Sequence, residues 1–320
     1  MIARHIHVYG LVQGVGFRPF VYRIAAENGL SGWVKNTTRG VELEIQGSEA
    51  GVFSFLHSLE YHAPPLSRVE RVISEETTPE AGRSSFEIIK SRSSSGEITR
   101  VSPDVCVCDD CLSDMETQPN RIDYPFTNCT NCGPRFTIIR DLPYDRGKTT
   151  MESFNLCSSC RAEYEDITNR RFHAQPNACA DCGPVCTFTD RHGSFSEIRR
   201  VLTETAKVID GGGIAAVKAL GGFHLVCDAL NEEAVGSLRR RKHREAKPFA
   251  LMARDLETVR TFVLVSSEEE ALLTGMRRPI VLLKRSSDPA SSVAWGLDTL
   301  GVMLPCTPLQ VLLFRYLKTP

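Results

Sequence analysis

The chain has 320 residues, of which 42% are hydrophobic and 24% are charged, and its formal net charge is -1 at pH 7. This composition is typical of globular proteins of two or three domains and excludes a disordered or fibrous chain. No stretch approaches the roughly 20 apolar residues of a membrane span, and the balanced charge makes nucleic acid an unexpected partner. Because no basic and apolar leader opens the chain, we expect a cytoplasmic protein with no membrane partner.

The first 90 residues predict a small domain with the element order β-α-β-β-α-β. Alternating apolar residues favour strands at 5–9, 30–35 and 41–46, and the sequence favours a last strand through residues 86–89. One helix opens at Pro19, and a second helix precedes the last strand. This is the ferredoxin-like order of elements.

A glycine-rich loop, Gly-Leu-Val-Gln-Gly-Val-Gly-Phe-Arg at residues 10–18, joins the first strand to the first helix. Backbone N–H groups at a helix N-terminus bind anions, and the guanidinium of Arg18 matches two oxygens of a phosphate. The amide of Asn36, at the end of the second strand, suits the positioning of an attacking water. A plain turn with a surface arginine is the alternative. His5 and His7 share one face of the first strand, and we interpret them as structural.

Eight of the 12 cysteines form four C-x-x-C pairs within residues 103–190, a stretch that is poor in regular patterns. The gaps between paired knuckles are 17 and 18 residues, which is typical of zinc ribbons in a reducing compartment. Four thiolates leave no open coordination position, so two zinc ions would be structural. Iron–sulfur ligation and unligated cysteines are the alternatives. The two predicted ligand sets are Cys108, Cys111, Cys129 and Cys132, and Cys157, Cys160, Cys179 and Cys182. Cys106 and Cys186 are interpreted as bystanders.

A serine-rich linker at 91–102 precedes the cysteine-rich stretch, and an α/β domain is predicted at 195–320. In that domain a buried strand at 214–217 is followed by Lys218, Gly221 and Gly222, and a helix is followed by a basic run. These segments are candidates for binding a triphosphate, and a solvated helix end is the alternative. Residues 170–176 have two equally good interpretations: a loop that contacts another domain, or a loop exposed to solvent.

Several of these motifs resemble known families. Residues 10–18 resemble the acylphosphatase signature, and residues 242–248 resemble the nucleotide-binding stretch of the YrdC-like fold. With both motifs in this order around the cysteines, the chain is similar to the NiFe hydrogenase maturation carbamoyltransferase family HypF. Stretches at 124–129, 132–137 and 296–305 share the likeness.

The resemblance implies an α+β multidomain protein with an acylphosphatase-like domain at 1–90, a double zinc-finger domain at 103–190 and an incomplete YrdC-like domain at 195–320. It implies that Arg18 binds phosphate and Asn36 positions water. The phosphate-binding loop would be Val12, Gln13, Gly14, Val15, Gly16 and Phe17. The nucleotide-binding residues would be Lys218, Gly221, Gly222, Lys242, Arg244 and Lys247.

The implied activity is a carbamoyl transfer that uses carbamoyl phosphate and ATP, with Mg²⁺. Carbamoyl phosphate is hydrolysed, ATP converts the carbamate to carbamoyl adenylate, and the acceptor is the C-terminal cysteine of a maturation partner of the HypE type. That thiocarbamate leads to a cyanide ligand of the hydrogenase iron. Because this family continues past the last residue here, we expect a fragment that hydrolyses carbamoyl phosphate without completing the transfer. An RNA-binding zinc-ribbon protein and an acylphosphatase alone are the other hypotheses.

Overall fold

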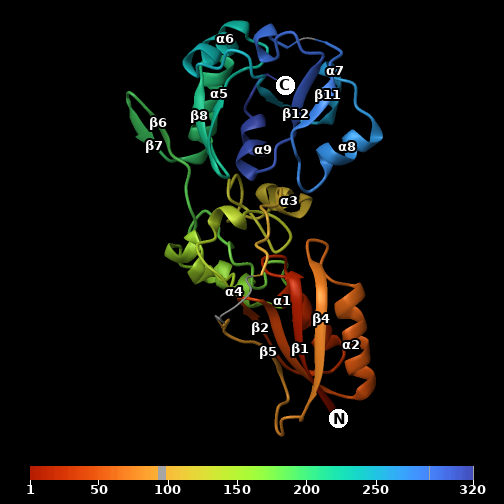
Figure 1. Cartoon of the computed structure of the whole chain (residues 1–320). Helices are drawn as coiled ribbons and strands as arrows, with labels where there is room; N and C mark the ends of the chain where they lie inside the picture. The colour runs from red at the N-terminus through yellow and green to blue at the C-terminus, as the bar shows by residue number, and fades with distance from the viewer. Residues whose placement is uncertain (93–98, 288, 320) are drawn as a thin grey trace. The chain divides into compact units, whose positions relative to one another are not determined.

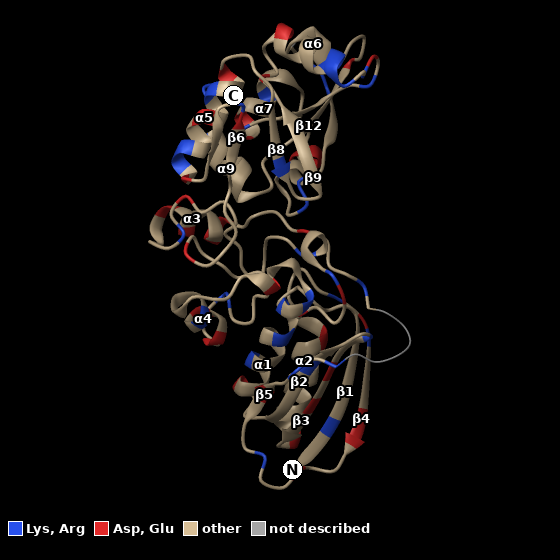
Figure 2. Ribbon diagram, turned by 90° about the vertical axis from the view of Figure 1, so that its left-hand side faces the viewer, with Lys and Arg blue, Asp and Glu red and all other residues tan. Residues whose placement is uncertain are grey.

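The computed structural model describes residues 1–92, 99–287 and 289–319 (Figure 1). The chain divides into two compact units. The first contains Met1–Asp104 and Asn128–Ala178, and the second contains Val105–Thr127 and Cys179–Pro320. Among the described residues, no helix is long and apolar enough to cross a membrane. Lys and Arg are interspersed with Asp and Glu along the ribbon, as the sequence predicts (Figure 2).

The first unit is built on a five-stranded sheet with the strand order β4-β1-β3-β2-β5. The neighbours β4-β1, β1-β3 and β3-β2 are antiparallel, and β5 lies parallel to β2. The order β4-β1-β3-β2 is that of the ferredoxin-like fold, so this prediction is confirmed. The strands are β1 (Ile2–Leu11), β2 (Ser31–Thr37), β3 (Gly40–Gly47), β4 (Arg68–Thr77) and β5 (Phe86–Ile88).

Two helices, α1 (Phe17–Glu27) and α2 (Glu49–Tyr61), share one core with this sheet. Alternate residues of β1 and β3, such as Ile6 and Leu43, are completely buried in that core. Their neighbours along each strand point to the opposite face of the sheet because side chains alternate. The period-two pattern of the sequence therefore places the apolar core and the polar face correctly.

The extended segment predicted at residues 86–89 does form a strand, but it is not the last strand of the ferredoxin-like order. The strand that completes it is β4, which pairs with β1 at the edge of the sheet, while Phe86–Ile88 form a short additional strand. β4 carries charged residues and is largely exposed along its length, so it lacks the apolar alternation by which a half-buried strand is recognised. Its partner strand, and not its own composition, decides its conformation.

The cysteine-rich part of the first unit has little regular structure, in agreement with its sequence. It contains α4 (Ser158–Glu165) and three short 3-10 helices, η1 (Phe136–Ile138), η2 (Arg146–Lys148) and η3 (Thr150–Ser153). The predicted linker at 91–102 falls largely on residues 93–98, which lie outside the described residues. Just beyond them, the Thr99 hydroxyl donates a hydrogen bond of 3.0 Å to the Gly10 carbonyl.

The second unit holds a three-stranded sheet of order β10-β12-β11 and two separate hairpins, β6-β7 and β8-β9. Its apolar core gathers around that sheet, and a second cluster joins α3, α5 and α9. The predicted strand at 214–217 is only half-buried in the β8-β9 hairpin, so its expected burial is wrong. The strands are β6 (Phe188–Asp190), β7 (Gly193–Phe195), β8 (Ala215–Ala219), β9 (Gly222–Val226), β10 (Ala250–Met252), β11 (Val281–Lys284) and β12 (Thr299–Met303). The helices are α3 (Asp109–Thr117), α5 (Ile198–Asp210), α6 (Glu232–Arg241), α7 (Leu256–Phe262), α8 (Ser267–Thr274), η4 (Ser291–Val293) and α9 (Pro308–Phe314).

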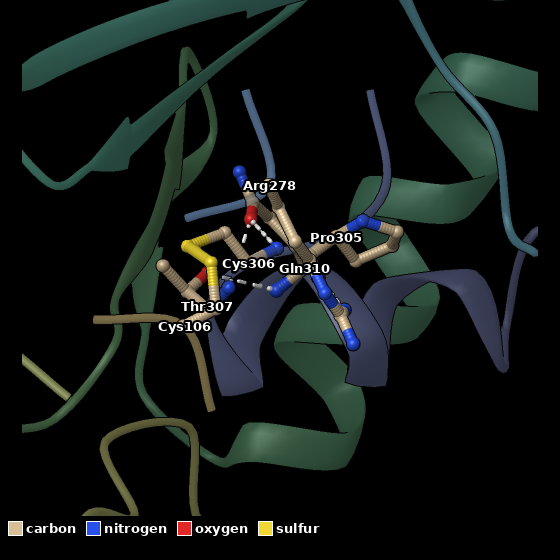
Figure 3. The surroundings of a disulfide bond; sticks show 6 residues. All are labelled: Cys106, Arg278, Pro305, Cys306, Thr307 and Gln310. Atoms are coloured by element: carbon tan, nitrogen blue, oxygen red, sulfur yellow. Dashed lines mark hydrogen bonds between the residues drawn. A yellow bond between two sulfur atoms is a disulfide. The ribbon is translucent and has the colours of Figure 1, made fainter. Parts of the chain in front are cut away.

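Cys106 is not a bystander, because it forms a disulfide with Cys306 within the second unit (Figure 3). The bond links residues that lie 200 positions apart in the sequence. Beside it, the Gln310 side chain accepts hydrogen bonds from the backbone N–H groups of Cys306 and Thr307 at 2.9 and 3.0 Å, which caps α9. The disulfide thus fixes the segment before the first cysteine knuckle to the start of α9.

Candidate active site and metal centres

The glycine-rich loop forms a turn between β1 and α1, as predicted. Gly14 and Gly16 have φ angles of 71° and 74°, a left-handed conformation that glycine adopts without strain. A Cβ added at Gly14 would come within 3.1 Å of the Arg135 side chain, so the close packing here also requires glycine. The Gln13 amide donates to the carbonyls of Thr37 and Gly40 at 2.6 and 2.8 Å, which ties the loop to the β2-β3 turn.

Arg18 and Asn36, the two predicted catalytic residues, both face the segment that carries Tyr144 and Asp145. One guanidinium nitrogen of Arg18 lies 2.8 Å from an Asp145 carboxylate oxygen, and the other donates to the Tyr144 carbonyl at 3.3 Å. The Asn36 amide donates to that same carbonyl at 3.1 Å. The structure therefore brings Arg18 and Asn36 to one place and adds a partner that the sequence did not reveal.

The side-chain oxygen of Asn36 has no hydrogen-bond partner among the described residues, although only 1% of the residue is exposed. An unpaired buried acceptor costs free energy unless a ligand or a water satisfies it. Arg18 is also buried, with 8% of the residue exposed, so its charge is screened less than it would be in bulk water. Together the two residues offer a cation for a phosphate and an acceptor for the O–H of a water.

A small cavity of about 30 Å³ lies above the loop. Its wall includes Arg18, Asn36, Tyr144, His173 and Gln175, all within the first unit. This volume holds about one or two waters. The loop at 170–176, for which the sequence fitted two interpretations, contributes to this wall through His173 and Gln175.

His173 has a neutral imidazole at neutral pH. Burial, and after it the positive charge of Arg18, lower the pKa of His173 to about 4. Its φ is 53°, which is uncommon for a side-chain-bearing residue, and its ring packs against Tyr164 with the centroids 4.9 Å apart. His173 therefore offers a neutral polar wall to the cavity and does not compete with Arg18 for an anion.

Arg135 connects the cysteine knuckle to the glycine-rich loop. It is 2% exposed, and its guanidinium donates to the carbonyls of Cys129, Thr130 and Cys132 at 2.9 to 3.0 Å and also to that of Gly14. The Tyr144 backbone N–H donates to the Gln13 side chain at 2.9 Å. The position of the loop thus depends on residues that follow it by more than a hundred positions.

The eight predicted cysteine ligands form two clusters, each with all four sulfur atoms within 4.8 Å of one another. The Sγ atoms of Cys129 and Cys132 lie 3.7 Å apart, and those of Cys179 and Cys182 lie 3.8 Å apart. Four thiolates at ~2.3 Å around a tetrahedral zinc would be separated by ~3.8 Å, so the residues fit this ion. Burial raises the pKa of Cys186 to about 11, and Cys186 belongs to neither cluster.

The predicted nucleotide-binding residues are only partly brought together. Lys242 and Arg244 line a cavity of about 450 Å³ in the second unit. They follow the basic end of α6, which is coloured blue in Figure 2. The other predicted residues do not line it: Lys218, Gly221 and Gly222 lie in the β8-β9 hairpin, and Lys247 lies in the loop after α6.

The loop after α6 is held by Arg239, a residue that the sequence interpretation treated only as part of a basic run. Arg239 is 5% exposed, and its guanidinium donates to the carbonyls of Arg244 and Lys247 at 2.6 and 3.1 Å and to that of Ser292. It also packs over the Phe249 ring. Arg239 is therefore an organiser of the loop and not a free cation for a ligand.

Comparison with known proteins agrees with this arrangement. Residues 4–88 match the acylphosphatase family, residues 107–139 and 156–189 match the HypF finger, and residues 207–320 match a Sua5, YciO and YrdC family described as telomere recombination. The chain is 46% identical over 313 residues to the carbamoyltransferase HypF of Rhodobacter capsulatus, which covers 98% of this chain and 41% of that protein. The chain belongs to the HypF carbamoyltransferase family.

Other relatives match this chain at a similar sequence identity and over a similar share of their length. The probable carbamoyltransferase HypF of Methanocaldococcus jannaschii is 43% identical over 314 residues, which are 97% of this chain and 41% of that protein. A crystal structure of T. kodakarensis HypF superposes with a TM-score of 0.90 at 47% identity, covering 100% of this chain and 41% of the other. A full-length HypF in a phosphate- and nucleotide-bound form gives a TM-score of 0.94 at 45% identity, covering 100% of this chain and 42% of the other. The chain thus spans about 40% of the length of these relatives. The domain boundaries drawn from the sequence stay a prediction.

The contact between Arg18 and Asp145 leads to a prediction about substrate affinity. Asp145 pairs with the guanidinium that is predicted to bind phosphate, and its negative charge would repel a phosphate at that position. We expect Asp145→Asn to lower KM for carbamoyl phosphate about tenfold while kcat changes less than about threefold. Steady-state kinetics of phosphate release measure both constants. A raised KM would show instead that Asp145 holds Arg18 in the orientation that binds phosphate.

Sequence reasoning missed Tyr144 and His173 as parts of the cavity wall and Asp145 as the ion-pair partner of Arg18. Tyr144 and Asp145 stand in a stretch without apolar periodicity, and neither belongs to a recognised motif. The one signal was the basic and aromatic loop at 170–176, which carries His173 between two cysteine knuckles. Their approach to Arg18 arises only from the folding of the cysteine-rich segment onto the sheet domain within the first unit.

Proposed function

We propose that this chain hydrolyses carbamoyl phosphate at the cavity between Arg18 and Asn36 and binds ATP in its α/β part for the activation of the released carbamate. The observation that carries this proposal is the pairing of a buried cation with an unsatisfied buried amide oxygen above the glycine-rich loop. Membership of the HypF carbamoyltransferase family supports the choice of carbamoyl phosphate among acyl phosphates.

In the proposed hydrolysis, Arg18 and the backbone N–H groups of the loop hold the phosphate oxygens. Asn36 accepts a hydrogen bond from the attacking water, whose oxygen adds to the phosphorus. The bond from phosphorus to the bridging oxygen breaks, and the products are carbamate and inorganic phosphate. Because an acyl phosphate is already activated, positioning and charge neutralisation supply most of the catalysis.

In the proposed activation, the carbamate oxygen attacks the α-phosphate of ATP, which yields carbamoyl adenylate and releases pyrophosphate. Lys242 and Arg244 would neutralise phosphate charge, and Lys218, Gly221, Gly222 and Lys247 are further candidates for contacts with the nucleotide. Mg²⁺ is expected to accompany ATP. In the complete pathway, a later step would pass the carbamoyl group to the C-terminal cysteine thiolate of a hydrogenase maturation partner of the HypE type, with release of AMP.

We further propose that each four-cysteine cluster holds one structural zinc ion. The support is the distance between sulfur atoms, which matches a tetrahedral set of thiolates, and the match to the HypF finger. Four thiolates leave no position for water, so the ions would organise the fold and take no part in the reaction.

Two measurements on the same protein test the proposed function. Phosphate release from carbamoyl phosphate reports the first step, and a calorimetric titration with ATP reports nucleotide binding. We expect both, and we expect Lys242→Ala to weaken ATP binding about tenfold while phosphate release stays unchanged. Lys207→Ala, at an exposed position of α5, is the matched control and should change neither result.

The other hypotheses predict different outcomes. Hydrolysis without any ATP binding would indicate an acylphosphatase alone. A steep, salt-dependent affinity for RNA without hydrolysis would favour a nucleic-acid-binding protein. Either result would contradict the proposed pathway.

A further inference from the structure

A cluster of metal-ligating side chains lies away from the sites described so far, on the face of the sheet opposite its helices. It consists of His5 and His7 of β1 and Glu42 of β3, whose ligand atoms all lie within 4.8 Å of one another. We propose that these three residues bind one divalent transition-metal ion of the zinc and nickel class, in addition to the two ions of the four-cysteine clusters.

The distances fit a shared ion. The Nε2 atoms of His5 and His7 are 3.1 Å apart, and Nε2 of His5 is 3.2 Å from a carboxylate oxygen of Glu42. Ligand atoms at ~2.05 Å around a tetrahedral ion are separated by ~3.3 Å, so a small adjustment of these side chains suffices. Without an ion, one imidazole nitrogen must donate a hydrogen bond to the other.

Strand pairing positions the three ligands before any ion binds. His5 and His7 lie two positions apart on β1 and so share a face, and His7 stands directly opposite Glu42 on β3. β1 and β3 are interior strands of the five-stranded sheet, and both have their other alternate residues in the core. A ligand set on such rigid strands loses little conformational entropy when an ion binds.

The surroundings of His5 resemble those of a metal-ligating histidine. A carboxylate oxygen of Glu44, which stands opposite His5 on β3, lies 3.6 Å from the other ring nitrogen of His5, Nδ1. Metal-bound histidines commonly direct their second nitrogen at a carboxylate, which orients the ring and makes it a better donor. Glu44 is therefore assigned a positioning role behind His5.

The charged residues near the three ligands affect the affinity of the site for a metal cation. Glu42, Glu44 and Glu75 provide negative charge on this face, and Glu75 stands opposite His5 on β4. The Lys35 ammonium lies 3.2 Å from the second oxygen of Glu42 and opposes a cation. Two imidazoles and one carboxylate favour zinc, nickel or copper over magnesium or calcium, and three protein ligands leave positions for water.

The first test is a calorimetric titration with zinc chloride. The protein is first saturated with zinc at its thiolate sites and dialysed, and its zinc content is measured, so that failure of the four-cysteine sites is detected separately. We expect one additional zinc per chain. His7→Gln should abolish this binding, and Glu44→Gln should weaken it about tenfold. His57→Gln removes an exposed histidine of α2 that also lies beside another histidine ring, and it should change nothing.

A second readout uses Trp33, whose ring centroid lies 5.8 Å from that of His5. In a Trp295→Phe background, paramagnetic Ni²⁺ should quench the remaining tryptophan fluorescence, and His7→Gln should remove the quenching. Circular dichroism shows whether His7→Gln is folded. If it is not, Glu42→Gln takes its place with the same expected loss. Absence of additional zinc in the wild type, or unchanged affinity in the folded variant, would overturn the proposal.

Discussion

Replacement of Arg18 by alanine is expected to lower kcat/KM for carbamoyl phosphate by about a thousandfold. Arg18 is the buried cation of the candidate site, and it lies beside Asn36 at a shared contact with the Tyr144 carbonyl. Alanine in its place would leave the phosphate charge uncompensated in a small cavity. Phosphate release, measured over a range of substrate concentrations, determines the constant.

Arg23→Ala is the matched control for Arg18→Ala, since Arg23 lies on the exposed side of the same helix. Asn36→Ala should lower kcat about a hundredfold with a smaller change in KM, because it removes the acceptor for water and leaves the cation in place. Thermal unfolding of each variant separates loss of catalysis from loss of fold. Wild-type kcat/KM in a folded Arg18→Ala protein would sink the assignment of the phosphate site.

Cys129→Ala is expected to reduce the zinc content from about two ions per chain to about one and to abolish phosphate release. The thiolate set would lose one of its four ligands, and structural zinc contributes on the order of 10 kcal/mol to folding in small zinc modules. The Cys129 carbonyl also accepts a hydrogen bond from Arg135, which contacts the loop at Gly14. Disturbance of this knuckle should therefore reach the phosphate site. Elemental analysis and the phosphate assay measure the two effects.

Cys186→Ala is the control for this experiment, because Cys186 stands close to a knuckle in the sequence but belongs to neither cluster. It should keep two zinc ions and full phosphate release. If Cys129→Ala lost an ion and retained wild-type hydrolysis, the glycine-rich loop would be independent of the knuckle. The serine-rich linker of the sequence favours that independence, and the hydrogen bonds of Arg135 and Tyr144 argue against it.

The sequence by itself determined the features that short-range patterns encode. Alternation along β1 and β3 gave the sheet and its buried face, and the glycine-rich string gave the cradle that carries Arg18. The spacing of the C-x-x-C pairs gave both ligand sets, because two thiolates of one knuckle must reach the same ion. The alternation, the glycine-rich string and each C-x-x-C pair lie within a few residues of chain, where local geometry fixes which side chains meet, and gaps of 17 and 18 residues join the pairs into sets.

Only the tertiary structure decided the features that depend on contacts between distant segments. Strand β4 is a strand because β1 pairs with it, and its own charged sequence gives no such signal. Arg18 contacts both Tyr144, which lies 126 positions later in the sequence, and its neighbour Asp145. Cys106 forms a disulfide with Cys306 across 200 positions. No periodic sequence pattern predicts such long-range contacts, because they result from the packing of whole segments and not from the conformation of the residues in contact.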